Sequence, residues 1–394
     1  MKKRSLSIFI ICYISYVFIY VSRLNLSMAA PSLKELAVLD TAQIGLLGSA
    51  FSVVYAFGRL FSGLIGDRQA PWKMISLGLI LCGITNLCVG TFPPFGAILL
   101  LWSINAFSQS MLWGAILRIL SAIYPENIAK KQASYMSTAV ASGNLLGILL
   151  NTELINRFGP QWAFLVPGGI TLLVSSFVII LTHRVIPVVQ TCNQNGYSKL
   201  LQKKSIQQML LPAVIHGVMK DNISLWMTVY IMDRFGIDLE QSSYFILLIP
   251  TLGFIGRLVA PTLYRVTKGH EKPLLLSAFA ACLVFSLLLI LLPVSAGISV
   301  LYLSLIYMAV SIINVCFLAF FPIQFAAEDL VSSVSGIMDF ATYLGTGLSA
   351  IVFGLIIDAW GYESMFFSWS LLSLLAVCLL TGKHKKVHAL RNHH

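Results

Sequence analysis

The sequence is poor in charged residues, and acidic residues are the scarcest of them. Only 10% of its 394 residues are Asp, Glu, Lys or Arg, and the acids number 15. Soluble proteins carry about 25% charged residues. A chain that is 58% hydrophobic and carries so few charged residues is not expected to be soluble in water. The excess apolar surface must face lipid, which excludes the soluble, multidomain protein that the length alone would suggest.

Several catalytic and metal-binding patterns are also missing. The chain has no Gly-x-x-x-x-Gly-Lys-[Ser/Thr] phosphate loop, no His-Glu-x-x-His and no Gly-x-Ser-x-Gly. Its seven cysteines include no Cys-x-x-Cys pair, so neither a metal site nor a disulfide framework is indicated. We therefore expect no enzyme activity, no metal and no cofactor. Because no nucleotide-binding domain is indicated, any transport would run on exchange or on an ion gradient.

Long apolar runs fill most of the chain. A membrane-spanning helix needs about 20 largely apolar residues, and about twelve runs reach that length. They predict an all-α membrane protein. The expected spans are residues 5–28, 41–66, 71–91, 95–122, 130–157, 161–182, 205–234, 241–264, 273–293, 297–321, 330–356 and 362–382.

Lys and Arg are distributed unevenly between the two sides of these spans. Eighteen of the 26 lie at the chain ends or in alternate connections, and three, Lys34, Arg157 and Arg234, lie in the opposite connections. Because basic loops stay in the cytoplasm, we expect both termini there, in a multi-pass protein of the plasma (inner) membrane. The basic residues are spread along short loops, which argues against nucleic-acid binding despite the net charge of +11. The expected partners are the lipid bilayer and a small anionic substrate, and we expect a monomer.

The longest connection, residues 183–204, divides the spans into two sets of six. It is polar and then basic. We predict a six-helix bundle at residues 1–182, a cytoplasmic linker at 183–204, and a second bundle with a short basic tail at 205–394. This is the plan of the major facilitator fold, whose parallel repeats surround a central cavity. Gly58-Arg59-Leu60 and Gly256-Arg257-Leu258 occupy matching places in spans 2 and 8, a faint trace of the repeat.

Seven charged residues fall inside the predicted spans. A charge at the bilayer centre costs about 2.5–3.5 kcal/mol or more on insertion scales. Each of them must therefore face protein, water or a ligand, and function is expected among them. They are Arg23, Arg59, Arg118, Lys220, Asp221, Arg257 and Asp339.

Some of these charges have a structural explanation. Arg59 and Arg257 lie near predicted cytoplasmic helix ends, where snorkelling or packing contacts would account for them. Asp67 and Arg68 end a Gly-x-x-x-Asp-Arg segment that resembles the major facilitator signature between helices 2 and 3. In that superfamily the loop latches the cytoplasmic face and does not touch substrate. For Arg118, near the cytoplasmic end of span 4, a gating role and ligand contact both remain open.

Arg23 lies on one helix face with two tyrosines. Tyr16, Tyr20 and Arg23 stand at positions i, i+4 and i+7. Such a stripe suits the wall of a polar cavity, and it also suits an aromatic belt at the outer membrane interface. The spacing does not decide between the two.

Lys220 lies near the middle of span 7, next to Asp221. Neighbours on a helix point about 100° apart, so one of these two would meet Asp339 of span 11 or a ligand. A buried Lys–Asp pair with no transport role is the alternative. His216, one turn before Lys220, is expected to share its face, although a lone helical histidine is more often packed than catalytic.

These residues resemble one branch of the major facilitators, the organophosphate:phosphate antiporters that carry glycerol 3-phosphate and hexose phosphates. Residues 20–31, YVSRLNLSMAAP, are similar to the family's Tyr-x-x-Arg-x-Asn with a downstream Ala and Pro. Gln109 and Trp113 match its helix 4, together with Arg118. Trp226 and Tyr230 follow Lys220 as Trp and Tyr follow the family's helix-7 arginine.

The resemblance implies a substrate site between the two halves. Arg23 and Lys220 would grip a phosphate or phosphoryl group, since a dianion in a low-dielectric cavity needs two cations nearby and a guanidinium binds phosphate with two parallel hydrogen bonds. Tyr16, Tyr20 and Tyr343 would line the same cavity. Asn144 would join them, because it occupies the second place of the family's helix-5 His-Asn pair, which here is Gly143-Asn144.

Two departures from the family pattern affect the expected substrate. The helix-7 arginine is replaced by Lys220, which lacks the fork geometry. Asp339 stands where the family has a small residue, and it could neutralise Lys220 and leave a net charge of about one in the cavity. These departures put exchange against inorganic phosphate in doubt.

Three functions follow from this pattern. The first is a secondary transporter of a small organic anion, expected to be phosphorylated, with inorganic phosphate or protons as the counter-substrate or coupling ion. The second is a proton-coupled symporter of carboxylates such as sugar acids, coupled through Asp339, with Asp221 and His216 as further candidates for coupling or charge pairing. The third is a membrane sensor of the same fold that binds ligand without transporting it.

Overall fold

The computed structural model describes residues 2–182, 200–236, 248–293 and 295–381. Within these residues the regular structure is helical, with no strand. The predicted linker at 183–204 and the basic tail fall largely outside the described residues.

Six spans make up the N-terminal half. Two of them are interrupted, at Met111 and at Thr138, which divides each into two shorter helices. An Asp40–Gln43 capping box starts the second span, because each side chain accepts a hydrogen bond from the other residue's backbone N–H. The elements are α1 (Lys2–Glu35), α2 (Thr41–Arg68), α3 (Pro71–Val89), α4 (Phe95–Ser110), α5 (Leu112–Ile123), α6 (Glu126–Ser137), α7 (Ala139–Phe158) and α8 (Trp162–Thr182).

The C-terminal half supplies six more spans. The last helix is bent at Gly361, whose φ of 76° is a left-handed conformation that favours glycine. The bend divides it into two arms, residues 331–360 and 362–381, which match two predicted spans. The elements are α10 (Lys204–Phe235), α12 (Leu248–Val266), α13 (Glu271–Leu291), α14 (Ala296–Val315), a π-helical turn η1 (Cys316–Phe320), α15 (Phe321–Ile323), a 3-10 turn η2 (Ala326–Glu328) and α16 (Val331–Thr381).

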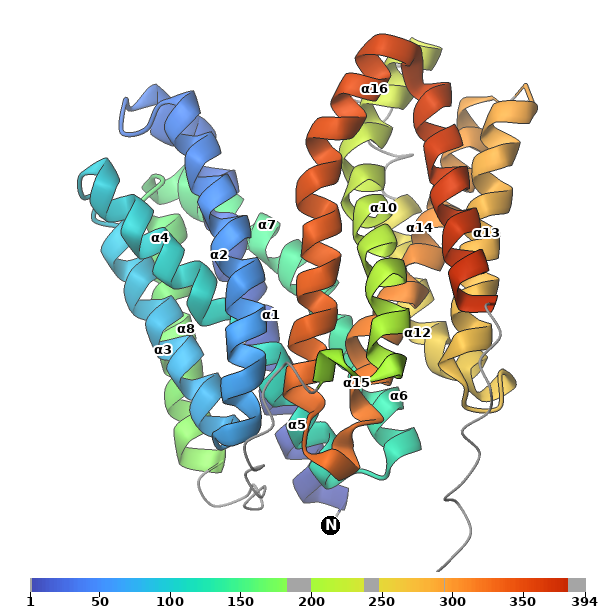
Figure 1. The fold of residues 1–394 in the computed structure, drawn as a ribbon. Coiled ribbons are helices and arrows are strands. Elements are labelled where there is room, and N and C mark those ends of the chain that lie inside the picture. The colour runs from blue at the N-terminus through green and yellow to red at the C-terminus, as the bar shows by residue number, and fades with distance from the viewer. Residues whose placement is uncertain (1, 183–199, 237–247, 294, 382–394) are drawn as a thin grey trace, which may run out of the picture.

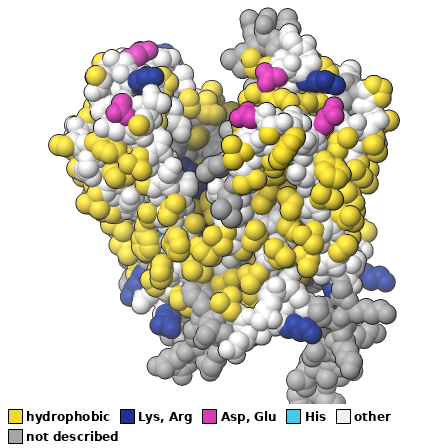
Figure 2. Space-filling view, turned by 45° about the horizontal axis from the view of Figure 1, so that its top comes forward, with side chains coloured by type: hydrophobic (Ala, Val, Ile, Leu, Met, Phe, Trp, Pro, Cys, Tyr) yellow, Lys and Arg dark blue, Asp and Glu magenta, His cyan; other side chains and the backbone are white. Residues whose placement is uncertain are grey.

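The predicted all-α plan of twelve spans is confirmed by this architecture. Among the described residues, nine helical segments are long and apolar enough to cross a membrane by length and composition alone. The other three spans are α10, α12 and the first arm of α16. Each carries at least one predicted intramembrane charge: Lys220 and Asp221 on α10, Arg257 on α12, and Asp339 on α16. In Figure 2 apolar side chains cover the sides of the molecule, while charged ones gather toward its two ends.

The two halves meet at one end of the molecule and separate toward the other (Figure 1). The N-terminus, α5, α6 and α15 lie at the end where the halves meet, which we call the closed end. Figure 2 looks obliquely onto the opposite end and shows a hollow between the two halves.

Small residues allow α16 to approach the N-terminal half closely at the closed end. A Cβ atom on Gly66 or Gly114 would collide with the Ser332 side chain. The Asp67 carboxylate accepts hydrogen bonds from the backbone N–H groups of Ser332 (2.9 Å) and Ser333 (2.8 Å), at the start of α16. These donors and the helix dipole both favour a negative charge at that position. Asp67 therefore ties α2 to α16.

Lys130 makes a second tie between the halves at the closed end. Lys130 is the first residue of the predicted span 130–157, and the structure buries it on α6, with 1% of its side chain exposed. Its Nζ lies 2.7 Å from Glu271 Oε1 and 2.6 Å from Tyr264 Oη, both in the C-terminal half, and 2.9 Å from Glu126 Oε1. A buried ammonium needs such partners to offset its desolvation.

Candidate functional site

A cavity of about 400 Å³ lies between the two halves. Its walls come from α1, α2, α5, α6 and α7 on one side and from α10, α12, α14, η1 and α16 on the other. All six residues predicted to bind substrate line this one cavity: Tyr16, Tyr20, Arg23, Asn144, Lys220 and Tyr343. The Tyr16–Tyr20–Arg23 stripe thus faces a cavity rather than the lipid interface.

The cavity is strongly cationic. Among the described residues, four basic side chains line it, Arg23, Arg59, Lys220 and Arg257, together with one carboxylate, Asp339. The formal excess among these described residues is three positive charges, whereas the sequence suggested about one. Because charges interact strongly in a low-dielectric site, this cavity favours an anion with more than one negative charge.

Arg23 is held in place by a polar chain and by aromatic rings. Its Nε donates to Gln109 Oε1 at 3.1 Å, and Gln109 Nε2 donates to Asn105 Oδ1 at 2.6 Å. The guanidinium carbon lies 4.2 Å from the ring centre of Tyr55 and 4.8 Å from that of Tyr20. Its Nη2 is buried and has no hydrogen-bond partner among the described residues. A ligand with an acceptor oxygen would satisfy this donor.

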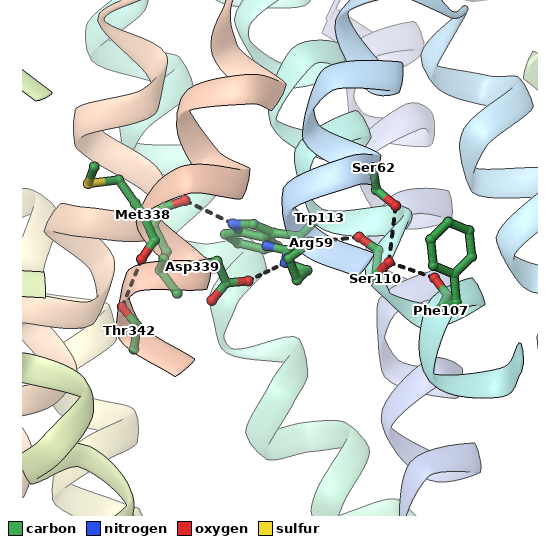
Figure 3. Close-up of polar contacts among 9 residues, drawn as sticks. Arg59, Ser62, Phe107, Ser110, Trp113, Met338, Asp339 and Thr342 are labelled. Carbon is green, nitrogen blue, oxygen red and sulfur yellow. Dashed lines mark hydrogen bonds and ion pairs between the residues drawn. The ribbon is translucent and has the colours of Figure 1, made fainter. Parts of the chain in front are cut away.

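Arg59 is placed differently from its expected position. It does not snorkel toward a helix end, because it is 3% exposed and lines the cavity. Its Nε donates to Asp339 Oδ2 across the two halves, and its Nη1 donates to the Ser110 carbonyl at 3.2 Å (Figure 3). Figure 3 shows the guanidinium between these two partners, with Ser62 bonded to Ser110.

The ion pair that the structure gives Asp339 is therefore with Arg59, whereas the sequence offered Lys220 or Asp221 as its partner. The Lys220 ammonium lies 5.0 Å from the ring centre of Tyr343, in cation–π range. The side chain of Asp221 lies outside the described residues.

Aromatic rings connect the cations of the two halves. Tyr55 contacts Arg23 on its own side and Tyr343 on the other, with the two tyrosine ring centres 5.1 Å apart. Trp113 packs against Tyr16 at 5.1 Å and donates its indole N–H to the Leu318 carbonyl at 2.8 Å. Neither Tyr55 nor Trp113 was predicted as a site residue. The helical spacing could have indicated Tyr55, since it stands one turn before Arg59 on the same helix face.

Arg257 also lies on the cavity wall rather than at a helix end. Its backbone carbonyl accepts a hydrogen bond from Ser134 Oγ at 2.5 Å. Its Nε is buried and has no hydrogen-bond partner among the residues described. Snorkelling or packing near a helix end, the role expected for Arg257, does not explain why this side chain lines the cavity.

The other predicted residues whose side chains are described lie outside the cavity lining. His216 is buried behind it, where Nε2 is 3.1 Å from Asn314 Nδ2 and the ring packs against Phe317. Arg118 lies at the closed end, where it donates to the Gly66 carbonyl and to the Gln69 carbonyl (2.8 Å), with its Nε 3.8 Å from Asp67. Arg118 therefore contacts residues at the closed end and does not line the cavity.

Arg68 is exposed beside these residues. No group of three or more His, Cys, Asp or Glu residues within the described ranges could hold a metal ion.

Comparison with known proteins gives a consistent set of similarities. A family model described as the Major Facilitator Superfamily matches residues 12–350. A probable hexose phosphate transport protein of Chlamydia trachomatis is 30% identical over 173 residues, which are 44% of this chain and 38% of that protein. The membrane sensor protein UhpC of Salmonella typhimurium is 24% identical over 91% of this chain and 87% of its own length.

Solved structures show the same fold. The fucose:proton symporter FucP of Escherichia coli superimposes with a TM-score of 0.70 at 16% identity, over 95% of this chain and 97% of that one. At this identity the similarity concerns the fold alone. This chain thus spans less than half of the chlamydial relative, and nearly all of the sensor and the symporter.

Proposed function

Because the chain belongs to the Major Facilitator Superfamily, we propose that it carries a small phosphorylated organic anion across the membrane by alternating access around the cationic cavity. Membership confirms the resemblance to that superfamily found in the sequence. It also confirms that the chain is not an enzyme, since the relatives are named as transport and sensor proteins.

The observation that carries the proposal is the charge of the cavity. Arg23 presents a buried Nη2 that has no partner within the described part of the chain, in a cavity where the described side chains give an excess of three positive charges. A phosphate monoester dianion supplies acceptor oxygens for the guanidinium and neutralises two of these charges. The name of the chlamydial relative, a hexose phosphate transport protein, supports the same class of substrate.

The arrangement of the halves fits an outward-facing state. The ties made by Asp67 and Lys130 lie at the end that carries the N-terminus, and the hollow lies at the other. The excess of Lys and Arg on the N-terminal side supports a cytoplasmic location for that end. On this proposal the protein spans the plasma membrane with both termini cytoplasmic, and its cavity is open to the outside.

Replacing Arg23 by Gln is expected to lower uptake of phosphate esters into proteoliposomes by about 10–100-fold, since a hydrogen bond to a charged group contributes about 1.5–3 kcal/mol. Labelled glucose 6-phosphate, glycerol 3-phosphate and 3-phosphoglycerate are the test substrates. Lys34→Gln removes one positive charge from an exposed site of the same helix, α1, and should transport normally. Equal uptake by the Arg23→Gln and parent proteins would show that the site is wrongly assigned.

A proton-coupled carboxylate symporter is the second candidate, and the buried Arg59–Asp339 pair in the cavity favours it. In this case a sugar acid would acidify the vesicle lumen as it enters. Asp339→Asn would then abolish acidification while leaving sugar-acid exchange intact. No pH change with any sugar acid would rule this candidate out.

The sensor remains a third candidate because the relative named as a membrane sensor matches most of this chain. Ligand binding in thermal-shift measurements, with no uptake or exchange of the same ligand in proteoliposomes, would identify a sensor.

A further inference from the structure

A second cavity, of about 770 Å³, lies at the closed end between α6 of the N-terminal half and α12 of the C-terminal half. We call it the seam cavity. The connection from α12 to α13 and the side chains of Phe320 and Gln324 complete its walls. It shares no lining residue with the central cavity. Because both halves contribute walls, the seam cavity is complete only while the closed end holds together.

The corresponding contact between the halves leaves no such space. In the parallel repeats of this fold, α2 corresponds to α12 and the start of α16 corresponds to α6. The pocket between α2 and α16 has no volume accessible to a water molecule. Gly66 permits this close approach, since a Cβ atom there would collide with Ser332.

The repeated Gly-Arg-Leu trio aligns α2 with α12 residue by residue. The seventh residue after Arg59 in α2 is Gly66. The seventh residue after Arg257 in α12 is Tyr264, which lines the seam cavity. A large ring therefore stands where the other half has the glycine that permits close contact. This difference accounts for the space between α6 and α12.

The next residue along each helix has opposite charge in the two halves. In α2 it is Asp67, whose carboxylate accepts two backbone hydrogen bonds at the start of α16. In α12 it is Arg265, which lines the seam cavity. The contact between α2 and α16 thus contains its own anion, whereas the contact between α6 and α12 places a cation beside an open space. An anion from outside the chain would fit there.

The seam cavity is cationic. Four basic and two acidic side chains line it among the described residues, an excess of two positive charges. Lys130 Nζ lies 2.9 Å from Glu126 Oε1 and 2.7 Å from Glu271 Oε1, so it engages both acids. Lys131 Nζ lies 5.6 Å from the ring centre of Tyr135 on its own helix. The other two cations are therefore the ones available to a ligand.

These two cations are Arg265 and Lys268. Neither forms an ion pair with another described residue. Lys268 adopts a φ of 55°, which is uncommon outside glycine. Its N–H donates to the Arg265 carbonyl at 3.0 Å, and the Gly269 N–H donates to the Tyr264 carbonyl at 3.0 Å. This hydrogen-bonded turn keeps both cations on the wall of the same cavity.

We propose that the seam cavity binds a doubly charged phosphate group, held by Arg265 and Lys268. A guanidinium binds phosphate with two parallel hydrogen bonds, and an ammonium adds a point charge. Two negative charges balance the excess of two positive charges. Inorganic phosphate in solution and the headgroup of phosphatidic acid both supply such a group. Because the site needs both halves in contact, its ligand stabilises the closed end by mass action.

Titration calorimetry with the full-length protein in phosphatidylcholine nanodiscs tests the site. The probes are inorganic phosphate and the short-chain lipid dihexanoyl phosphatidic acid. All variants are made in the Arg23→Gln protein, whose central cavity is weakened for phosphate. The test variant adds Arg265→Gln and Lys268→Gln. The matched control adds Lys204→Gln and Lys272→Gln, which remove two positive charges from the same half at sites outside both cavities.

The Arg23→Gln protein should bind at least one of the two probes, and the test variant should bind that probe at least about 10-fold more weakly. The control should bind it within about 2-fold of the Arg23→Gln value. Tighter binding of the short-chain lipid would identify a lipid headgroup as the source of the phosphate group, and tighter binding of phosphate would identify the free ion. Dihexanoyl phosphatidylcholine, which has the same chains and no net charge, measures partition into the bilayer.

Two results would overturn the proposal. One is binding of neither probe by the Arg23→Gln protein, and the other is a folded test variant that binds both probes as tightly as the control. Thermal unfolding without a probe establishes folding, and Arg265→Gln alone replaces the double substitution if the latter does not fold. Uptake by the parent protein reports on the central cavity and these titrations report on the seam cavity, so either proposal can fail without the other.

Discussion

Replacing Asp339 by Asn is expected to destabilise the protein by about 3–5 kcal/mol, because removal of one partner leaves the other charge buried and uncompensated. Asp339 pairs with Arg59, and the two side chains are 5% and 3% exposed. The pair also joins α2 to α16 across the two halves. Denaturant unfolding in detergent micelles, followed by tryptophan fluorescence, measures the change.

Two further variants separate the ion pair from other effects of the substitution. Asp358→Asn removes a carboxylate from an exposed site on the same helix and should be nearly neutral. The double variant Arg59→Gln/Asp339→Asn removes both charges and should recover most of the lost stability. A stable Asp339→Asn protein, or a double variant less stable than the single one, would show that the pair does not stabilise this state.

Replacing Lys130 by Met is expected to destabilise the contact between the two halves at the closed end by about 3–5 kcal/mol, the cost of leaving Glu271 buried without its cation. Lys130 contacts Glu271 and Tyr264 in the opposite half and is buried at the closed end. Without it, the closed end should open. Distances between spin labels placed on the two halves at this end, measured by pulsed electron resonance, should lengthen.

Lys131→Met is the matched control, since Lys131 is the next residue and its ammonium contacts the ring of Tyr135 on its own helix. It should leave the distances unchanged. An unaltered distribution in the Lys130→Met protein would contradict a latch at Lys130 and would leave Asp67 as the stronger tie between the halves. Both variants remove one positive charge at nearly the same place in the sequence. A difference between them is therefore due to the burial of Lys130 and its contacts, and not to the loss of charge.

Much of the candidate site could be predicted from helical spacing and from the resemblance. Tyr16, Tyr20 and Arg23 share a face because a helix repeats every 3.6 residues, and Lys220 and Tyr343 were identified by the motifs around them. All of these line the cavity. Arg59 and Arg257 were assigned to helix ends, because a sequence gives the depth of a residue along a span only approximately. It does not show which side of the helix faces the other half.

The pairing of charges needed the tertiary structure. Arg59 and Asp339 are 280 residues apart, and in sequence Asp339 could equally have met Lys220 or Asp221. In sequence Lys130 and Lys131 are two adjacent lysines at the start of a predicted span, and only the fold places Glu271 and Tyr264 against Lys130.

The sequence by itself determined the number of spans, the division into two halves and the presence of cations within the membrane. These are properties of local composition, since a helix that spans the bilayer needs about 20 apolar residues. A charged residue within such a run is easy to recognise because it is costly there. Only the tertiary structure decided which cation pairs with Asp339. That depends on which helices face each other across the cavity. Arg59 of α2 faces Asp339 of α16 and forms the ion pair, whereas the buried Nε of Arg257 has no hydrogen-bond partner among the described residues.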